Sequence, residues 1–340
     1  MIYGGWFARE GSASAPYMTV GYQVVEQDYA DYSAIPGVDS VVVVIDGRMN
    51  LCAEFTQFKM DFDPCPCTTC PCPCGESPTF DSITNASLNT VALGITQKFC
   101  QSEHVGGVHI DLEPLGITKY HGSVVSFLTS MAAGLAATNC KSTAFPTGRS
   151  LSVFGFAEDL SSDILDALGP NGMVIISGYD LYPDLNSAGQ DDFQFNSIVE
   201  YKNKLSRQLN ATQLALKNHK TSFSLAIPIS ASSHEYETYT PDPSKLYCGP
   251  ACTGMENTVT MSDYINAAYD VMSYPEHSEF LAMHDGTAKD PTPSQFRGPT
   301  LWLMSGPQTP NWEYPKHSGN MWSPNHPNAD AYKTLMERLK

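Results

Sequence analysis

The segment GGVHIDLEP, Gly106 to Pro114, places ionisable residues at every second position of an otherwise apolar run. These residues are His109, Asp111 and Glu113. In a β-strand alternate side chains share a face, so all three would line one face while apolar residues pack on the other. Burying an unpaired ionisable group is costly. The pattern therefore indicates a functional ladder, which could serve as a set of metal ligands or as an acid catalyst.

Glu113 has the clearest chemical role in this ladder. Pro114 follows it and ends the strand, which places Glu113 at the C-terminal edge. In barrels of parallel strands and helices, that edge carries the chemistry. Partial burial and the nearby carboxylate of Asp111 would both raise the pKa of Glu113. A carboxyl group that is protonated near neutral pH can donate a proton to a leaving oxygen, so we predict a general acid.

Short apolar runs alternate with helical patterns along most of the chain, and they predict the elements that position this ladder. The predicted strands are IYGGWF near the start, Val38–Gly47, Val105–Ile110, Ser150–Asp159, Met173–Pro183, Ser222–Ser230, Pro299–Met304 and, with a poorer pattern, Ala53–Phe62. The predicted helices are Asp81–Cys100, Gly122–Ala137, Leu160–Gly169, Asn196–Gln208, Asp263–Met272 and Ala329–Leu339.

The order of these elements predicts the fold class. Strands that are apolar on both faces and separated by helices are typical of a parallel sheet covered by helices. About seven such units in one chain favour a closed barrel over an open sheet. We therefore predict an α/β fold, a (β/α)₈ TIM barrel that forms a single catalytic domain over residues 1–340.

A Cys- and Pro-rich stretch, CPCTTCPCPCG from Cys65 to Gly75, interrupts this pattern within an insertion at about 63–78. The chain has 10 cysteines, which is typical of an exported, disulfide-bonded protein. We predict a disulfide-linked loop that also recruits Cys52 or Cys100, and a thiolate metal cluster is the alternative. Cys140 has no obvious partner in the sequence.

Composition limits the classes of partner. The formal net charge is -17, so the chain repels phosphate groups, and we predict neither nucleic acid nor anionic membrane as a partner. A neutral polysaccharide or glycan is compatible with this charge. No apolar run approaches the roughly 20 residues of a membrane span, and the opening residues lack a signal-peptide pattern. We expect an extracellular protein, no cofactor and no metal, and the sequence leaves the oligomeric state open.

Several segments together resemble the family 18 glycoside hydrolases, the chitinases and endo-β-N-acetylglucosaminidases. HIDLE is similar to the second half of the family's D-x-x-D-x-D-x-E signature. Later segments follow in the family's order: SGYDLYP resembles its M-x-Y-D segment, LAIPIS its G-x-P strand, and GPTLWLM the strand whose Trp floors the substrate pocket. IYGGWF resembles the first strand more loosely.

The resemblance implies a role for each matching residue. Glu113 would be the general acid, and Asp111 would stabilise the oxazolinium that forms when the substrate's acetamido carbonyl attacks the anomeric carbon. Tyr179 would hold the acetamido oxygen, and Asp180 would contact the sugar nearby. Trp302 would stack under the sugar ring.

The pattern departs from the family at two positions, where Gly106 replaces the first Asp and His109 the middle one. We interpret His109 either as a hydrogen-bonded interior histidine or as a group that donates to Asp111, or charges beside it, and so favours its ionised form. His109 is also a candidate substrate-binding residue, and Trp6 is a further candidate for a sugar-binding platform.

We therefore predict a glycosidase that acts on β-1,4-linked N-acetylglucosamine in a polysaccharide such as chitin, or in a glycan. Two alternatives remain open. A metal-dependent barrel hydrolase would use His109, Asp111 and Glu113 as ligands. A carbohydrate-binding barrel without activity would have no need of the acid Glu113.

Overall fold

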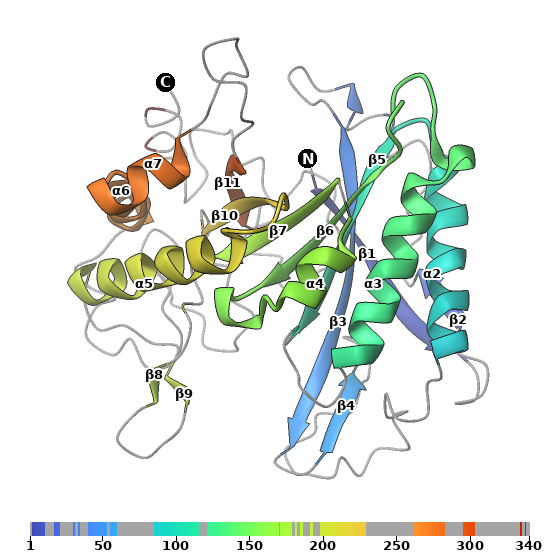
Figure 1. Ribbon diagram of the computed structural model, residues 1–340, viewed down its shortest axis with the longest axis horizontal. Helices are drawn as coiled ribbons and strands as arrows, with labels where there is room; N and C mark the ends of the chain where they lie inside the picture. The colour runs from blue at the N-terminus through green and yellow to red at the C-terminus, as the bar shows by residue number, and fades with distance from the viewer. Residues whose placement is uncertain are drawn as a thin grey trace, which may run out of the picture. The chain divides into compact units, whose positions relative to one another are not determined.

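The structure is a computed structural model (Figure 1). It describes residues 2–10, 17–20, 30, 33–34, 40–52, 55–59, 85–113, 115, 121–169, 171–178, 181, 184–185, 191–192, 198–228, 261–282, 295–302, 334 and 337. None of the helices among these residues is long and apolar enough to span a membrane.

The chain divides into two compact units. The first comprises Met1–Ile175 and Ala215–Ser222, and the second comprises Ile176–Leu214 and Phe223–Lys340. The strand β7 (Gly172–Ser177) runs from the first unit into the second. The expectation of a single domain over residues 1–340 stays a prediction.

The first unit contains most of the sheet. Its parallel strands pair in the order β1-β3-β5-β6, and β2 and β4 pair antiparallel with β1 and β3. The bounds are β1 (Ile2–Glu10), β2 (Tyr17–Val20), β3 (Val41–Cys52), β4 (Phe55–Lys59), β5 (Val105–Glu113) and β6 (Ser150–Gly155). Parallel strands alternate with helices here, which confirms the α/β class.

The pairing of β3 with β5 contains one irregularity, at Gly106. Val41 pairs with Val105, but Val42 pairs with Gly107, so β5 carries one extra residue between these two pairs. A Cβ added at Gly106 would lie 2.5 Å from the Cβ of Ser40, which is closer than carbon atoms pack. Only glycine therefore fits this position without a shift of its neighbours.

The predicted parallel strand at Ala53–Phe62 is wrong. The strand found there, β4, pairs antiparallel with β3, with Arg48 opposite Lys59 and Cys52 opposite Phe55; the two strands run side by side in Figure 1. Two residues separate β3 from β4, and a parallel pair needs a crossover of a dozen residues or more. The strands that pair with β3 in parallel are β1 and β5.

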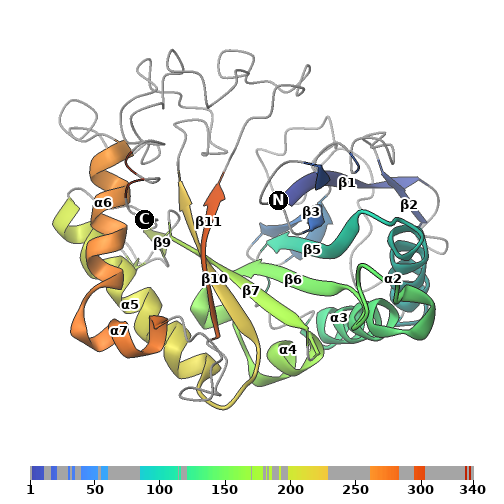
Figure 2. The ribbon, with the colours of Figure 1, turned by 90° about the horizontal axis from the view of Figure 1, so that it is seen from above.

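Helices α2 (Asn85–Cys100), α3 (His121–Ala136) and α4 (Ser162–Ala167) belong to the same unit. Helices α2 and α3 lie side by side, and they pack on β5 and β6 respectively (Figure 2). Their buried apolar residues recur mostly every three or four positions and form one apolar face on each helix; they are Ala92, Ile95, Phe99, Val124, Phe127, Leu128, Met131 and Leu135. Helix α4 is capped at both ends, since Ser161 accepts a hydrogen bond from the Ile164 amide and Gly169 follows with φ +72°.

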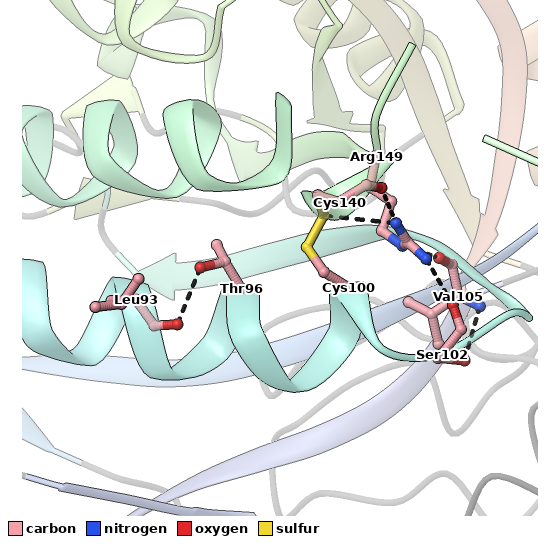
Figure 3. Close-up of a disulfide and its surroundings, with 7 residues drawn as sticks. All are labelled: Leu93, Thr96, Cys100, Ser102, Val105, Cys140 and Arg149. Carbon is pink, nitrogen blue, oxygen red and sulfur yellow. Dashed lines mark hydrogen bonds between the residues drawn. A yellow bond between two sulfur atoms is a disulfide. The ribbon is translucent and has the colours of Figure 1, made fainter. Parts of the chain in front are cut away.

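A disulfide joins the end of α2 to the segment after α3. Cys100 pairs with Cys140, 40 residues away, with a Cα–Cα distance of 4.6 Å (Figure 3). The sequence offers no obvious partner for Cys140 and predicts either Cys52 or Cys100 as a partner of the Cys-rich stretch. That stretch lies outside the described residues, and the sequence pattern could not reveal that the folded chain brings residues 100 and 140 together.

Arg149 links the same region to the start of β5. Its buried guanidinium donates hydrogen bonds to the carbonyl oxygens of Val105 (2.8 Å), Ser102 (2.6 Å) and Cys140 (Figure 3). Hydrogen bonds from a charged donor are stronger than neutral ones. The disulfide and Arg149 therefore anchor the N-terminal end of the strand that carries the acidic ladder.

The second unit contains the parallel pair β10 (Ser222–Pro228) and β11 (Phe296–Trp302) with α5 (Ile198–Leu216), α6 (Met261–Met272) and α7 (Pro275–Leu281) (Figure 2). Two short strands, β8 (Asp184–Leu185) and β9 (Asp191–Asp192), form a separate antiparallel pair. The ring of Phe223 on β10 stacks on Phe280 of α7 at 4.7 Å and packs on Phe296 at 5.1 Å. These aromatic contacts join α7 to both strands.

Polar contacts connect the three helices. Lys202 of α5 pairs with Asp270 of α6 at 2.6 Å, and Ser206 of α5 contacts His277 of α7 at 2.9 Å. Helix α5 is longer than predicted by eight residues at its C-terminus, ending at Leu216 where Gln208 was expected. Helix α7 was not predicted, and in the predicted final helix Thr334 and Glu337 are the helical residues described.

Removing the disulfide by Cys100→Ala together with Cys140→Ala should lower the free energy of unfolding by about 2–4 kcal/mol, because an open chain gains entropy when it unfolds. Urea denaturation measures this loss. Peptide mapping without reductant should recover Cys100 linked to Cys140. Recovery of Cys100 linked to a cysteine of the segment Cys65–Cys74 would contradict the pairing.

Gly106→Ala should destabilise the protein by about 1–3 kcal/mol, because the added methyl group forces Ser40 or the backbone to move. Gly94→Ala on α2 is the matched control, since a Cβ there meets no atom within 4 Å. Alanine in a helix should stabilise the control by up to about 1 kcal/mol. Equal denaturation midpoints for the two variants would show that Gly106 is not sterically required.

Candidate functional site

The register of the first unit places two carboxylate residues at neighbouring positions of β3 and β5. Asp46 is the Cα partner of Asp111, and Trp6 of β1 is the Cα partner of Asp46. Register partners on adjacent strands occupy the same face of a sheet. Asp111 is 4% exposed, so a carboxyl group of the predicted ladder is buried. Trp6, Asp46 and Asp111 thus form one row across three strands.

The next row towards the carboxyl edge carries Glu113. It is the last residue of β5, as predicted, and its Cα partner on β3 is Arg48. Arg48 in turn lies opposite Lys59 of β4. The acid candidate therefore occupies the register position opposite one basic residue, Arg48, which is itself paired with a second basic residue, Lys59. The side chain of Glu113 lies outside the described residues, and its role stays a prediction.

The row below Asp111 contains His109, which is 1% exposed. Its Nδ1 atom lies 2.9 Å from Oγ of Ser152, its register partner on β6. Burial lowers the pKa of His109 to about 3, because a charged imidazolium loses its hydration inside the protein. His109 is thus a neutral, hydrogen-bonded interior histidine. Burial opposes the alternative in which His109 charges beside Asp111, and substrate binding by His109 stays a prediction.

A second acidic residue follows β6 at the carboxyl edge. Asp159 ends the 3₁₀ turn Ala157–Asp159, where the chain was expected to remain a strand. Burial raises the pKa of Asp159 to about 6; the hydrogen bond from the Phe156 amide opposes this shift and the charge of Glu158 adds to it. Asp159 is therefore a further group that can hold a proton near neutral pH, and sequence patterns gave no signal for it.

In the second unit, the end of β7 is held from two sides. The buried hydroxyl of Tyr201 on α5 donates to the Gly178 carbonyl at 2.8 Å, and Gln208 Nε2 donates to the Ser177 carbonyl at 3.4 Å. A Cβ added at Gly178 would lie 2.5 Å from the Ala226 carbonyl oxygen, so glycine allows the chain to approach β10. The backbone that leads into the next two residues is thereby anchored.

Those two residues, Tyr179 and Asp180, lie outside the described residues. Trp302 is the last described residue of β11, and it falls within the strand predicted at Pro299–Met304. The roles of Tyr179, Asp180, Trp302 and Trp6 stay predictions. Among the side chains that the structure describes, no three metal-binding groups lie together, and the metal alternative likewise remains a prediction.

Sequence reasoning missed Asp46, Arg48 and Ser152 as neighbours of the ladder. Asp46 ends an apolar run, VVVVID, that resembles the run carrying Asp111, and this repetition was the available signal. The pairing itself depends on register. Register cannot be read from either strand alone, because a slip of one residue exchanges the faces.

Comparisons with known proteins give similarity at the level of solved structures. No family model matches the sequence, and no curated protein matches it. The structures that resemble it include an endo-β-N-acetylglucosaminidase from Cordyceps militaris (TM-score 0.34, 10% identity, 72% of each chain covered). A structure of fungal β-1,4-galactanases has a TM-score of 0.38 and 12% identity, with 73% of this chain and 67% of that chain covered. A chitinase from Chromobacterium violaceum has a TM-score of 0.29 and 14% identity, with 68% of each chain covered. The names of these similar proteins are those of glycosidases. The function proposed for this chain rests on its own residues.

The buried, neutral His109 should make the protein less stable in acid. Its folded pKa is lowered from 6.5 to about 3, so its contribution is complete above pH 6.5 and is lost as the pH falls below that value. The loss should reach about 2 kcal/mol at pH 5. His109→Asn, which cannot ionise, should remove this part of the pH dependence when urea denaturation is compared at pH 7.5 and pH 5.

His121→Asn is the control, because His121 lies partly exposed at the start of α3, where it contacts Asp163 at 3.3 Å. It should leave the acid-induced loss of the buried histidine unchanged. An identical pH dependence for the parent and His109→Asn would contradict the buried neutral state.

Proposed function

We propose that this protein is a glycoside hydrolase that cleaves β-1,4-linked N-acetylglucosamine in a polysaccharide or glycan by substrate-assisted, retaining catalysis. One observation carries the proposal: the parallel strand β5 holds a buried Asp111 and ends at Glu113, at the carboxyl edge of the sheet. In α/β barrels that edge is where catalytic residues gather.

The chemistry assigned to the two carboxyl groups is the one that the resemblance to the family 18 glycoside hydrolases implies. Glu113, at the edge, protonates the glycosidic oxygen as the bond to the anomeric carbon breaks. The substrate's own acetamido oxygen attacks that carbon from the other side, and Asp111 stabilises the positive charge that develops on the acetamido group. Water then opens the oxazolinium, and Glu113 takes up the proton that the water loses.

The remaining roles in the proposal rest on the sequence pattern. Tyr179 would orient the acetamido oxygen, Asp180 would contact the sugar, and Trp302 would stack on a sugar ring, with Trp6 as a further platform. The α/β arrangement of parallel strands supports, as part of the same proposal, a closed (β/α)₈ barrel. The anchoring of Gly178 by Tyr201 supports a fixed position for the residues that follow it.

An extracellular location belongs to the same proposal. The Cys100–Cys140 disulfide supports it, because disulfides persist in oxidising compartments. The net charge of -17 supports a carbohydrate partner over nucleic acid or anionic membrane.

The test is turnover of chromogenic chitobiose and chitotriose substrates. The parent should release the chromophore, and Glu113→Gln should lower kcat by about 10²–10⁴-fold, because glutamine cannot donate the proton. Asp159→Asn is the control, since it removes another acid with a raised pKa from the neighbouring strand end. It should leave kcat within about tenfold of the parent.

Three outcomes would redirect the proposal. Loss of activity with a chelator would favour the metal-dependent hydrolase, in which His109, Asp111 and Glu113 are ligands. Sugar binding without turnover at any pH would favour the inactive carbohydrate-binding barrel. A larger loss in Asp159→Asn than in Glu113→Gln would move the acid role to Asp159.

A further inference from the structure

The two cysteines of the disulfide lie in different surroundings (Figure 3). Cys140 is 0% exposed, whereas Cys100, the last residue of α2, is partly exposed. In thiol–disulfide exchange a thiolate attacks one sulfur and the other sulfur leaves, and the rate depends on access to the sulfur that is attacked. A thiol from solvent therefore reaches Cys100 more readily than Cys140.

Arg149 favours Cys140 as the sulfur that leaves. Its Nη1 atom lies 3.5 Å from the Sγ atom of Cys140 and also donates to the carbonyl oxygen of that residue. Its other nitrogen atoms are held by the carbonyl oxygens of Val105 and Ser102, contacts that involve neither cysteine. Burial disfavours an anion, but a guanidinium in hydrogen-bond contact stabilises a thiolate. Departure of Cys140 as an anion is thus assisted by a cation that is already in place.

Cys100 has the opposite electrostatic environment. It is the last residue of a helix of 16 residues, and the carbonyl groups at the C-terminus of a helix carry a partial negative charge that disfavours an anion there. Access and the stability of the leaving thiolate therefore select the same direction of exchange, which is attack on Cys100 and release of Cys140.

The exposed charged side chains beside the two cysteines favour the approach of an anionic nucleophile. Within three residues of either cysteine in the sequence, these are Lys98, Lys141 and Glu103, so two positive charges stand against one negative charge. The chain as a whole has a net charge of -17. Exposed charges act over about 8 Å at physiological ionic strength, so this local set counts for more than distant acidic residues.

We propose that Cys100 is a site of S-thiolation by a small monothiol. The thiolate of the monothiol attacks the Sγ atom of Cys100, the bond between Cys100 and Cys140 breaks, and Cys140 leaves as a thiolate held by Arg149. One disulfide replaces another, so no oxidant or reductant is consumed, and the negative charge passes from the incoming thiol to Cys140. The reaction reverses when the Cys140 thiolate attacks the mixed disulfide and releases the monothiol.

The modification acts on the base of the strand that carries the acidic ladder. It removes the covalent link between the end of α2 and the segment after α3, and it leaves the contact between Arg149 and the Val105 carbonyl at the start of β5. The site goes beyond the proposed function, because the exchange needs neither a sugar nor the carboxyl groups of β5.

Incubation of the folded protein with glutathione tests the proposal. Denaturant with excess N-ethylmaleimide stops the exchange and labels each released thiol. Trypsin cleaves after Lys98, Lys119 and Lys141, so the two cysteines fall in separate peptides, 99–119 and 120–141, and mass spectrometry locates the glutathione. The form with glutathione on Cys100 and maleimide on Cys140 should exceed the reverse arrangement by about tenfold.

The same mapping after exchange in urea is the control. In urea both cysteines are hydrated and Arg149 no longer contacts Cys140, so the two adducts should form in comparable amounts. Equal amounts of the two adducts in the folded protein, an excess on Cys140, or no adduct on either cysteine would overturn the proposal. A preference for Cys100 that persists unchanged in urea would also overturn it, because the preference would then come from the local sequence and not from the fold.

Variants test the part that Arg149 plays. Arg149→Gln should bring the two adducts of the folded protein close to equal amounts, because it removes the positive charge beside the leaving sulfur. Arg207→Gln is the matched control, since Arg207 is exposed on α5, and it should keep the excess on Cys100. An unchanged excess in folded Arg149→Gln would contradict the role of the guanidinium.

A second pair of variants gives the same information if Arg149→Gln does not fold. Cys100→Ser leaves the thiol of Cys140 beside Arg149, and Cys140→Ser leaves the thiol of Cys100 at the end of α2. Ultraviolet absorbance of the thiolate should show that a larger fraction of Cys140 than of Cys100 is ionised at neutral pH. The reverse order would overturn the assignment of Cys140 as the leaving group.

Activity separates this inference from the proposed function. If the parent shows no turnover of chitobiose but the glutathione lies on Cys100, the glycosidase proposal fails and the modification site stands. If turnover is normal and the glutathione lies on Cys140 or on neither cysteine, the modification site fails and the glycosidase stands.

Discussion

The extra residue in β5 at Gly106 decides which residues of β3 face the acidic ladder. Before this point Val41 pairs with Val105, and after it Val42 pairs with Gly107. Without the extra residue Asp46 would pair with Ile110, on the opposite face of β5 from Asp111. A one-residue shift exchanges every side chain of a strand between the two faces. The close approach of Ser40 to Gly106 shows why a residue without a side chain occupies this position.

Contacts to which no catalytic role is assigned hold the strands of each unit in place. In the first unit, Arg149 and the Cys100–Cys140 disulfide bind the start of β5 to the end of α2. In the second, Tyr201 binds the carbonyl of Gly178 at the end of β7. Such anchors matter because a buried acid works only in a fixed position, and each buried donor here satisfies a backbone carbonyl that would otherwise lose its hydration.

Burial also sorts the ionisable groups into different states. It keeps His109 neutral through a pKa of about 3 and favours the protonated form of Asp159 through a pKa of about 6. His277, a buried residue of α7 that contacts Ser206 of α5, has its pKa lowered mainly by burial. A chain with a net charge of -17 thus contains interior groups whose charge depends on dehydration more than on the charge of the molecule as a whole.

The sequence by itself determined the α/β class, most strands and helices, and the strand that ends at Glu113, because apolar periodicity and Pro114 are local features. It could not determine that β4 turns back on β3, that Cys140 pairs with Cys100, or that Asp46 neighbours Asp111. In each case two residues meet in the fold, and the sequence around either one does not indicate which residue is its partner. Hydrogen-bonded register and packing decide them, and these exist only when distant segments meet in the folded chain.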